Sequence, residues 1–65
     1  MHRYFYVYAC TPHGTTYVGK CRTTEEELRR YLPGCSVAQN GVVNVWRAPN
    51  DTRETVRAAD RGVRA

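Results

Sequence analysis

Residues 6–20 read YVYACTPHGTTYVGK, and this stretch decides the fold. Aromatic and β-branched residues dominate residues 4–10 and again residues 15–21, a composition typical of strands. Between them, the sequence Thr-Pro-His-Gly at residues 11–14 places proline at the second position of a turn. We therefore predict a β-hairpin at the start of the chain.

The position of the turn determines which hairpin residues lie opposite each other. Counting outward from residues 11–14 pairs Tyr8 with Tyr17 within contact distance. Strand alternation then predicts one face with a ring-rich set and a second, more apolar face that helices cover. The first set is Tyr4, Tyr6, Tyr8, Cys10, Tyr17, Gly19 and Cys21, and the second is Phe5, Val7, Ala9 and Val18. Either the first face binds a ligand, whose backbone can approach the sheet at Gly19, or its tyrosines only coat a half-exposed sheet.

The rest of the chain predicts two helices and one more strand. Thr23 and Glu26 have capping-box spacing, with Thr24 and Glu27 as the alternative pair, and residues 33–34 (Pro-Gly) end this first helix. Residues 42–47 (VVNVWR) form a third strand, and a second helix begins at residue 50 or 51, with an apolar stripe that includes Val63. We expect an α+β fold in a single domain spanning residues 1–65, with element order β-β-α-β-α and a three-stranded antiparallel sheet.

Charge and composition limit the function. Ten Lys and Arg residues against six Asp and Glu residues give a net charge of +4. A basic surface suits a polyanion, although charge also serves solubility alone. Three cysteines without Cys-x-x-Cys spacing indicate reduced thiols rather than a disulfide framework or a zinc site. Since no apolar stretch approaches the roughly 20 residues that cross a bilayer and no signal-peptide pattern is present, we expect a cytoplasmic protein without membrane contact.

The two hairpin motifs resemble a known family. Tyr6-Val7-Tyr8 and Tyr17-Val18-Gly19 are similar to the paired motifs of the GIY-YIG nuclease superfamily, and the similarity extends through the first helix and into residues 42–60. The resemblance implies a metal-dependent endonuclease. It assigns Tyr17 to deprotonation of the attacking water and Tyr8 to the reacting phosphate, with one Mg²⁺ or Mn²⁺ as the cofactor.

Two further catalytic roles of the family fall on altered residues. The position of the family's phosphate-binding arginine is Glu27, so the resemblance offers Arg30, one helical turn on, for that role. Asp60 occupies the position of the family's metal-binding glutamate. The alternative is that Arg29 and Arg30 balance Glu25–Glu27 on a solvated face, and that Asp60 pairs with Arg57 or Arg64.

Two functions from different classes follow. The first is DNA or RNA binding with weak or lost cleavage, which is expected to use Gly19, Lys20, Arg22, Arg29, Arg53, Arg57 and Arg61. The second is a catalytically inactive inhibitor or adaptor that binds a specific protein, for example a phage counter-defence factor, because exposed Tyr, Trp and Arg dominate protein interfaces. For the arginines of the last helix, a solvated face remains the alternative.

Overall fold

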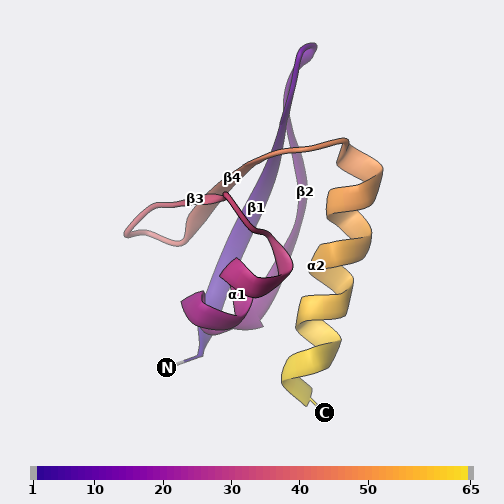
Figure 1. Cartoon of the computed structure of the whole chain (residues 1–65). Coiled ribbons are helices and arrows are strands. Elements are labelled where there is room, and N and C mark those ends of the chain that lie inside the picture. The colour runs from indigo at the N-terminus through magenta and orange to yellow at the C-terminus, as the bar shows by residue number, and fades with distance from the viewer. Residues whose placement is uncertain (1, 65) are drawn as a thin grey trace.

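The computed structural model describes residues 2–64, with side chains described up to residue 61. Its elements are β1 (Arg3–Thr11), β2 (Gly14–Thr23), α1 (Glu25–Tyr31), β3 (Ser36–Val37), β4 (Val42–Trp46) and α2 (Pro49–Arg64). Figure 1 shows the β1–β2 hairpin rising above the rest, with α2 running beside β2. No helix in the described part of the chain has the length and apolar character needed to cross a membrane.

The sheet has four strands in the order β2-β1-β4-β3. β1 pairs antiparallel with β2 and parallel with β4, and β3 pairs antiparallel with β4. The α+β class and the hairpin are confirmed, but the expected three-stranded antiparallel sheet is wrong. The connection from β2 through α1 and β3 leads to the other side of β1, where β4 pairs with β1 and runs parallel to it. The added strand, β3, has only two residues, too few to show a strand pattern in the sequence.

A β-bulge divides β2 into two halves. Tyr8 lies opposite Tyr17, as predicted, but Val7 lies opposite Gly19, so Val18 is an additional residue without a partner on β1. Val18 is buried, and a Cβ on Gly19 would lie 3.5 Å from Cγ1 of Val56 on α2, so both face the helices. Beyond the bulge the alternation is inverted. The expected placement of Gly19 and Cys21 on the tyrosine face is therefore wrong, and Lys20 and Arg22 occupy that face instead.

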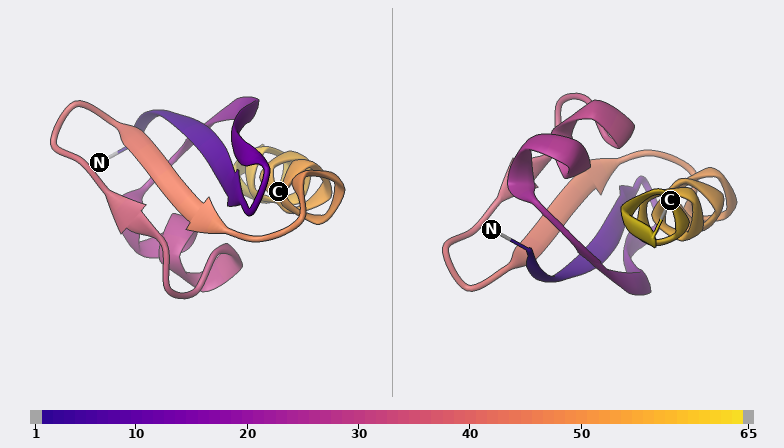
Figure 2. Two further views of the ribbon diagram at one scale, coloured as in Figure 1. Left: turned by 90° about the horizontal axis from the view of Figure 1, so that it is seen from above. Right: turned by 90° about the horizontal axis from the view of Figure 1, so that it is seen from below.

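Both helices cover the same face of the sheet. Phe5, Val7 and Ala9 of β1 are fully buried in a single core that also contains residues of α1, α2 and β4. These further residues include Leu28, Leu32, Val43, Val45, Val56 and Ala59. The helices also contact each other, and the two views in Figure 2 show α2 almost end-on at one side of the sheet. The opposite face of the sheet has no helix on it among the described residues.

The helix starts differ from the expected ones. Thr24, not Thr23, is the N-cap of α1, since its side chain accepts a hydrogen bond of 3.1 Å from the backbone N–H of Glu27. Thr23 is instead the fully buried last residue of β2. α2 begins at Pro49, before the predicted residue 50 or 51, because proline fits the first helical position, where no N–H donor is needed. The side chain of Val63, expected in the apolar stripe of this helix, lies outside the described side chains.

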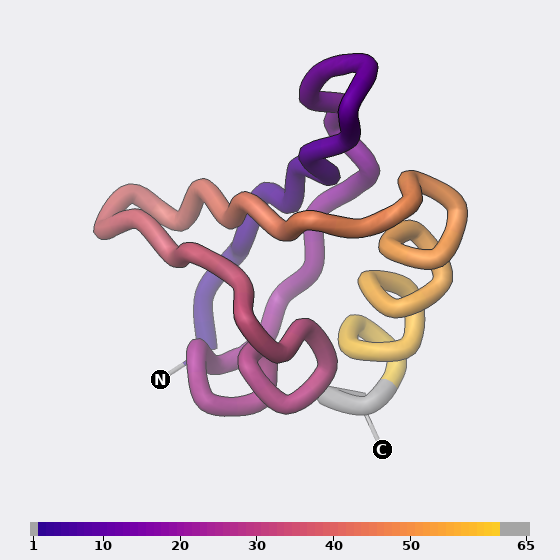
Figure 3. The backbone as a smooth tube through the Cα atoms, turned by 45° about the horizontal axis from the view of Figure 1, so that its top comes forward, coloured from indigo at the N-terminus to yellow at the C-terminus, as the bar shows by residue number. Residues whose placement is uncertain are grey.

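The loop before β4 is anchored to β1. Gly41 accepts a 2.9 Å hydrogen bond from the N–H of Tyr6, and a Cβ at Gly41 would lie 2.9 Å from the carbonyl oxygen of Tyr4. With φ of +91°, this position favours glycine on backbone grounds as well. Figure 3 shows the loop extending on the side of the molecule away from α2. Its approach to β1 leads β4 into parallel pairing from Tyr6 onward.

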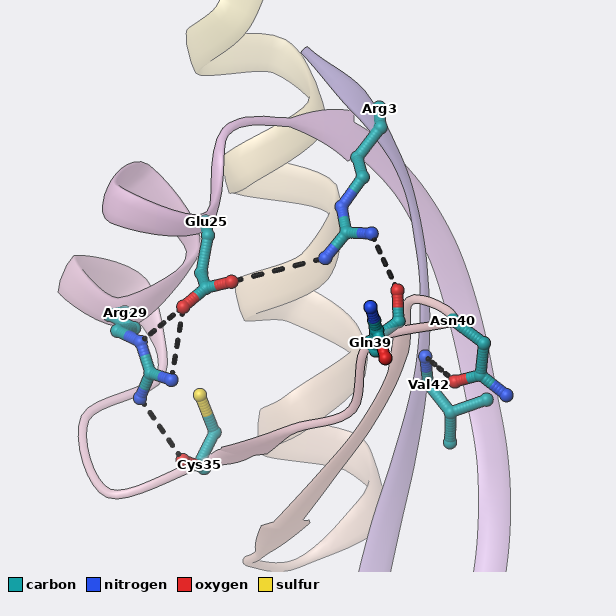
Figure 4. A network of polar contacts seen from close by, with 7 residues as sticks. All are labelled: Arg3, Glu25, Arg29, Cys35, Gln39, Asn40 and Val42. Carbon is teal, nitrogen blue, oxygen red and sulfur yellow. Dashed lines mark hydrogen bonds and ion pairs between the residues drawn. The ribbon is translucent and has the colours of Figure 1, made fainter. Parts of the chain in front are cut away.

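A polar network connects this loop to α1 (Figure 4). The Arg3 guanidinium donates to the carbonyl of Gln39 at 2.9 Å and lies 3.9 Å from the Glu25 carboxylate. Glu25 in turn pairs with Arg29 at 3.1 Å, and Arg29 donates to the carbonyl of Cys35 at 3.5 Å. Because the ion-paired groups are about half exposed, we attribute a positioning role to this network and only a small contribution to stability.

Candidate functional site

The uncovered face of the sheet carries the exposed rings of the protein, and we call it the open face. Its residues include Tyr4, Tyr6, Tyr8 and Cys10 of β1, Tyr17, Lys20 and Arg22 of β2, and Asn44 and Trp46 of β4. The exposed fractions are 50% for Tyr4, 40% for Tyr6, 47% for Tyr17 and 70% for Trp46. Since large aromatic side chains usually find cover in a small domain, this accumulation of exposed rings makes the open face the candidate functional surface.

The predicted tyrosine pair lies on this face. The rings of Tyr8 and Tyr17 are 5.2 Å apart between centroids, with an interplanar angle of 61°, which is an edge-to-face contact. Tyr8 is half-buried, and Tyr17 is more exposed. The two rings therefore pack against each other at the surface.

Two cations lie beside the rings. The Lys20 ammonium lies 5.2 Å from the centroid of the Tyr4 ring, a cation–π contact. Arg22, the next residue of β2 on this face, is opposite Tyr4, and Lys20 is opposite Tyr6. The bulge is responsible for this arrangement, because without it both charges would point toward the core.

Acidic residues are segregated from the open face. Of the six acidic residues in the sequence, Glu25, Glu26 and Glu27 lie on α1, and Asp51, Glu54 and Asp60 lie on α2. None of the described strands carries a carboxylate. The open face is consequently cationic and aromatic, whereas both helices carry charges of both signs.

A groove lies at the hairpin end, between the hairpin and the segment that leads from β4 into α2. Its volume is about 540 Å³, and it lies between residues 10–13 and 16 of the hairpin and residues 46–49. Cys10 and Trp46 belong to both surfaces. The Cys10 thiol is oriented by Asn44, whose Oδ1 lies 3.8 Å from Cys10 Sγ. His13 and Arg47 add polar groups to an otherwise largely apolar lining.

The arginines of α1 are engaged with glutamates, as the alternative interpretation expected. Arg30 contacts Glu26 at 3.1 Å and Glu27 at 2.7 Å, and Arg29 contacts Glu25. Because α1 lies on the covered face, neither guanidinium is near the tyrosine pair. The structure therefore does not bring Arg30 to the position that the family resemblance implied.

Asp60 lies at the outer edge of β2. Its Oδ1 accepts the backbone N–H of Arg22 at 3.5 Å, five residues along the strand from Tyr17, which corresponds to about 15 Å. Burial, and to a lesser degree the Asp60 carboxylate, raises the pKa of the Cys21 thiol to about 11. Among the described residues, no group of three or more His, Cys, Asp and Glu side chains is arranged to hold a metal ion. Asp60 and the tyrosine pair do not form one site.

The expected nucleic-acid-binding residues do not gather on one surface, and Arg29 lies apart from the others on α1. Lys20 and Arg22 lie on the open face, whereas Arg53, Arg57 and Arg61 are exposed along α2 on the other side of the molecule. Gly19 is covered by Val56. Trp46 was not among the residues expected to bind nucleic acid, although the alternation of buried Val43 and Val45 with exposed Asn44 and Trp46 is the signal that could have placed it there.

Comparisons of the chain with protein-family models, with characterised proteins and with solved structures find no match. The resemblance to the GIY-YIG superfamily therefore stays a prediction from the hairpin motifs. Any functional conclusion has to come from the site itself.

Proposed function

We propose that this domain binds nucleic acid through the open face. The observation that carries the proposal is the combination, on one uncovered sheet face, of a row of exposed rings with Lys20 and Arg22, on strands that carry no acidic residue. Cations that neutralise phosphates release condensed counterions, and rings provide stacking surfaces for bases. The face offers both.

Binding without cleavage is the better supported form of this function. Of the residues that the family resemblance assigned to catalysis, only Tyr8 and Tyr17 lie together. Arg30 is engaged with two glutamates, and Asp60 lies at the edge of β2, so a cation held by Asp60 would not meet the tyrosine pair. We accordingly assign Mg²⁺ or Mn²⁺ no role in the proposed binding.

A protein partner is the competing interpretation, since exposed Tyr, Trp and Arg also form binding hot spots. We favour a polyanion because the strands of the open face carry positive charge only, and every phosphate of a nucleic acid can meet it, whereas a protein partner would need a matching acidic patch. The binding experiment distinguishes the two.

The test compares two matched double variants. Lys20→Ala/Arg22→Ala and Arg53→Ala/Arg57→Ala each remove two exposed positive charges, one pair from the open face and one from α2. Affinity for a fluorescently labelled mixed-sequence oligonucleotide is measured by anisotropy over a series of salt concentrations. Each phosphate contact on a single strand contributes about 0.7 to the slope of log K against log salt, so the first variant should lose about 1.4 from the slope.

We expect the α2 variant to keep most of the wild-type slope. Loss of binding in the α2 variant alone would move the interface to α2 and refute the assignment to the open face. Absence of salt-dependent binding in the wild-type protein would refute nucleic-acid binding and favour the protein partner.

A further inference from the structure

We infer that the nucleic acid bound on the open face is single-stranded, with bases stacked on the ring row formed by Tyr4, Tyr6, Tyr8 and Trp46. This inference rests on the proposed function and specifies its ligand. It follows from the spacing of the rings, the width of the sheet and the position of Trp46.

The spacing of the rings fits an extended strand. Tyr4, Tyr6 and Tyr8 follow one another at every second residue of β1, which corresponds to about 6.6 Å per step. Successive nucleotides of one duplex strand rise by only about 3.4 Å. Each ring can therefore receive one base only when the strand is stretched about twofold, and a stretched strand has unstacked bases whose faces are free.

The shape of the open face disfavours a duplex. Three strands lie side by side along residues 6–10 of β1, and beside Tyr8 a fourth strand, β3, makes the sheet about 14 Å wide between its outer strands, even before side chains are added. The major groove of B-DNA is about 12 Å wide and admits a helix or a two-stranded ribbon. Rings lying on a sheet of this width cannot reach base edges in a groove, and in a duplex the faces of the bases are already covered by their neighbours.

Trp46 extends the ring row toward the groove at the hairpin end. It lies on β4 opposite Cys10 of β1, and Cys10 is two residues further along β1 than Tyr8. With 70% of its surface exposed, it is the most accessible large ring of the open face, and the groove of about 540 Å³ begins at its side. The row from Tyr4 to Trp46 thus provides about four stacking positions for as many nucleotides.

The phosphates have a corresponding path. Lys20 and Arg22 lie next to Tyr6 and Tyr4 on β2, so a strand whose bases cover the β1 rings would direct its backbone toward these cations. At the other end, Arg47 lines the groove next to Trp46. Because neither sugar is distinguished by these contacts, single-stranded DNA and single-stranded RNA are both included in the inference.

The closing experiment uses Trp46, the sole tryptophan of the protein, as an internal probe. Intrinsic fluorescence is followed while the protein is titrated with a 12-nucleotide oligo-dT, the corresponding oligo-U RNA, and a DNA duplex of the same length. We expect quenching and binding with at least one of the single strands, and at least tenfold weaker binding of the duplex.

Ring removal provides the second measurement. Trp46→Ala and Tyr6→Ala, tested with labelled oligonucleotides, should each weaken single-strand binding by roughly 5- to 150-fold, the range measured for loss of one stacked ring. Trp46→Phe should restore most of the affinity that Trp46→Ala loses, because it retains a stacking ring. Circular dichroism melting of each variant confirms that the fold is kept.

The outcomes separate this inference from the proposed function. One set of results would overturn the single-strand inference and leave nucleic-acid binding intact. In that case duplex and single strand bind equally well, Trp46→Ala and Tyr6→Ala keep the wild-type affinity, and Lys20→Ala/Arg22→Ala binds more weakly. If no nucleic acid binds at all, both proposals fail.

Discussion

Replacement of Thr23 and of Thr24 by valine should change the stability of the protein in opposite directions, although the two threonines are neighbours. The Thr23 side chain is fully buried, and its Oγ1 has no hydrogen-bond partner among the described residues. A buried hydroxyl without a partner costs about 1–3 kcal/mol relative to its hydrated state. Valine has nearly the same shape but no polar atom, so Thr23→Val should raise the free energy of unfolding by about 1 kcal/mol.

Thr24 has the opposite environment. Its side chain accepts the N–H of Glu27 at 3.1 Å and so satisfies one of the free donors at the start of α1. Loss of such a cap costs about 0.5–2 kcal/mol, and a β-branched apolar residue cannot replace it. We expect the two variants to differ by about 2 kcal/mol, a large fraction of the stability of a domain of 65 residues.

Urea denaturation followed by far-UV circular dichroism measures both values, and an unchanged m-value shows that the comparison is valid. The reasoning is refuted if Thr23→Val destabilises the protein as much as Thr24→Val, because that result would mean that the Thr23 hydroxyl makes a stabilising hydrogen bond in solution.

Three further perturbations test other parts of the structure. Gly41→Ala should lower the free energy of unfolding by about 2–4 kcal/mol in the same denaturation assay, because the new Cβ would lie 2.9 Å from the carbonyl oxygen of Tyr4. The matched Gly34→Ala, at a position that also has positive φ but open space around it, should lower it by only about 1–2 kcal/mol. Equal losses in the two variants would contradict the close approach at Gly41. The folded state favours the neutral thiol of Cys21, because folding raises the pKa of this group from 9.0 to about 11. The neutral thiol therefore contributes fully to the free energy of unfolding below about pH 9, and this contribution is lost as the pH rises toward 11. Over that interval the wild-type protein should lose roughly 1–2 kcal/mol more than Cys21→Ala, and parallel pH profiles would argue against the shift. Supercoiled plasmid incubated with the protein and Mg²⁺ or Mn²⁺ should remain intact, and metal-dependent nicking that disappears in Tyr17→Phe would show that the separation of Asp60 from the tyrosine pair is wrong.

Local patterns in the sequence predicted the half of the hairpin that lies next to the turn. Tyr8 and Tyr17 were paired correctly because a few residues of regular alternation connect them to residues 11–14. Beyond Val18 the predicted pairing was wrong, because the β-bulge shifts the register by one residue. Composition does not reveal such a bulge, which forms where α2 packs against Gly19. Cys21 was consequently placed on the wrong face.

Other errors have comparable causes. Thr23 and Thr24 both had a glutamate at capping distance, and the choice between them depends on where β2 ends, which tertiary packing determines. The parallel direction of β4 depends on the path of the connection and not on the residues of the strand. For the site, the residue types were found, but the division of the cations between the open face and α2 required the fold.

The additional residue at Val18 also makes the length of β2 a constraint in its own right. A β2 of the present length that paired with β1 without the bulge would still form the turn and the Tyr8–Tyr17 contact, yet the distal half of the strand would be turned inside out, with Lys20 and Arg22 directed into the apolar interior and Cys21 and Thr23 into solvent. Burial of two uncompensated cations would exceed what so small a domain can tolerate. A relative that keeps this fold without the additional residue should therefore carry the basic residues of its second strand at an even spacing from the residue that corresponds to Tyr17, whereas Lys20 and Arg22 follow Tyr17 at an odd spacing.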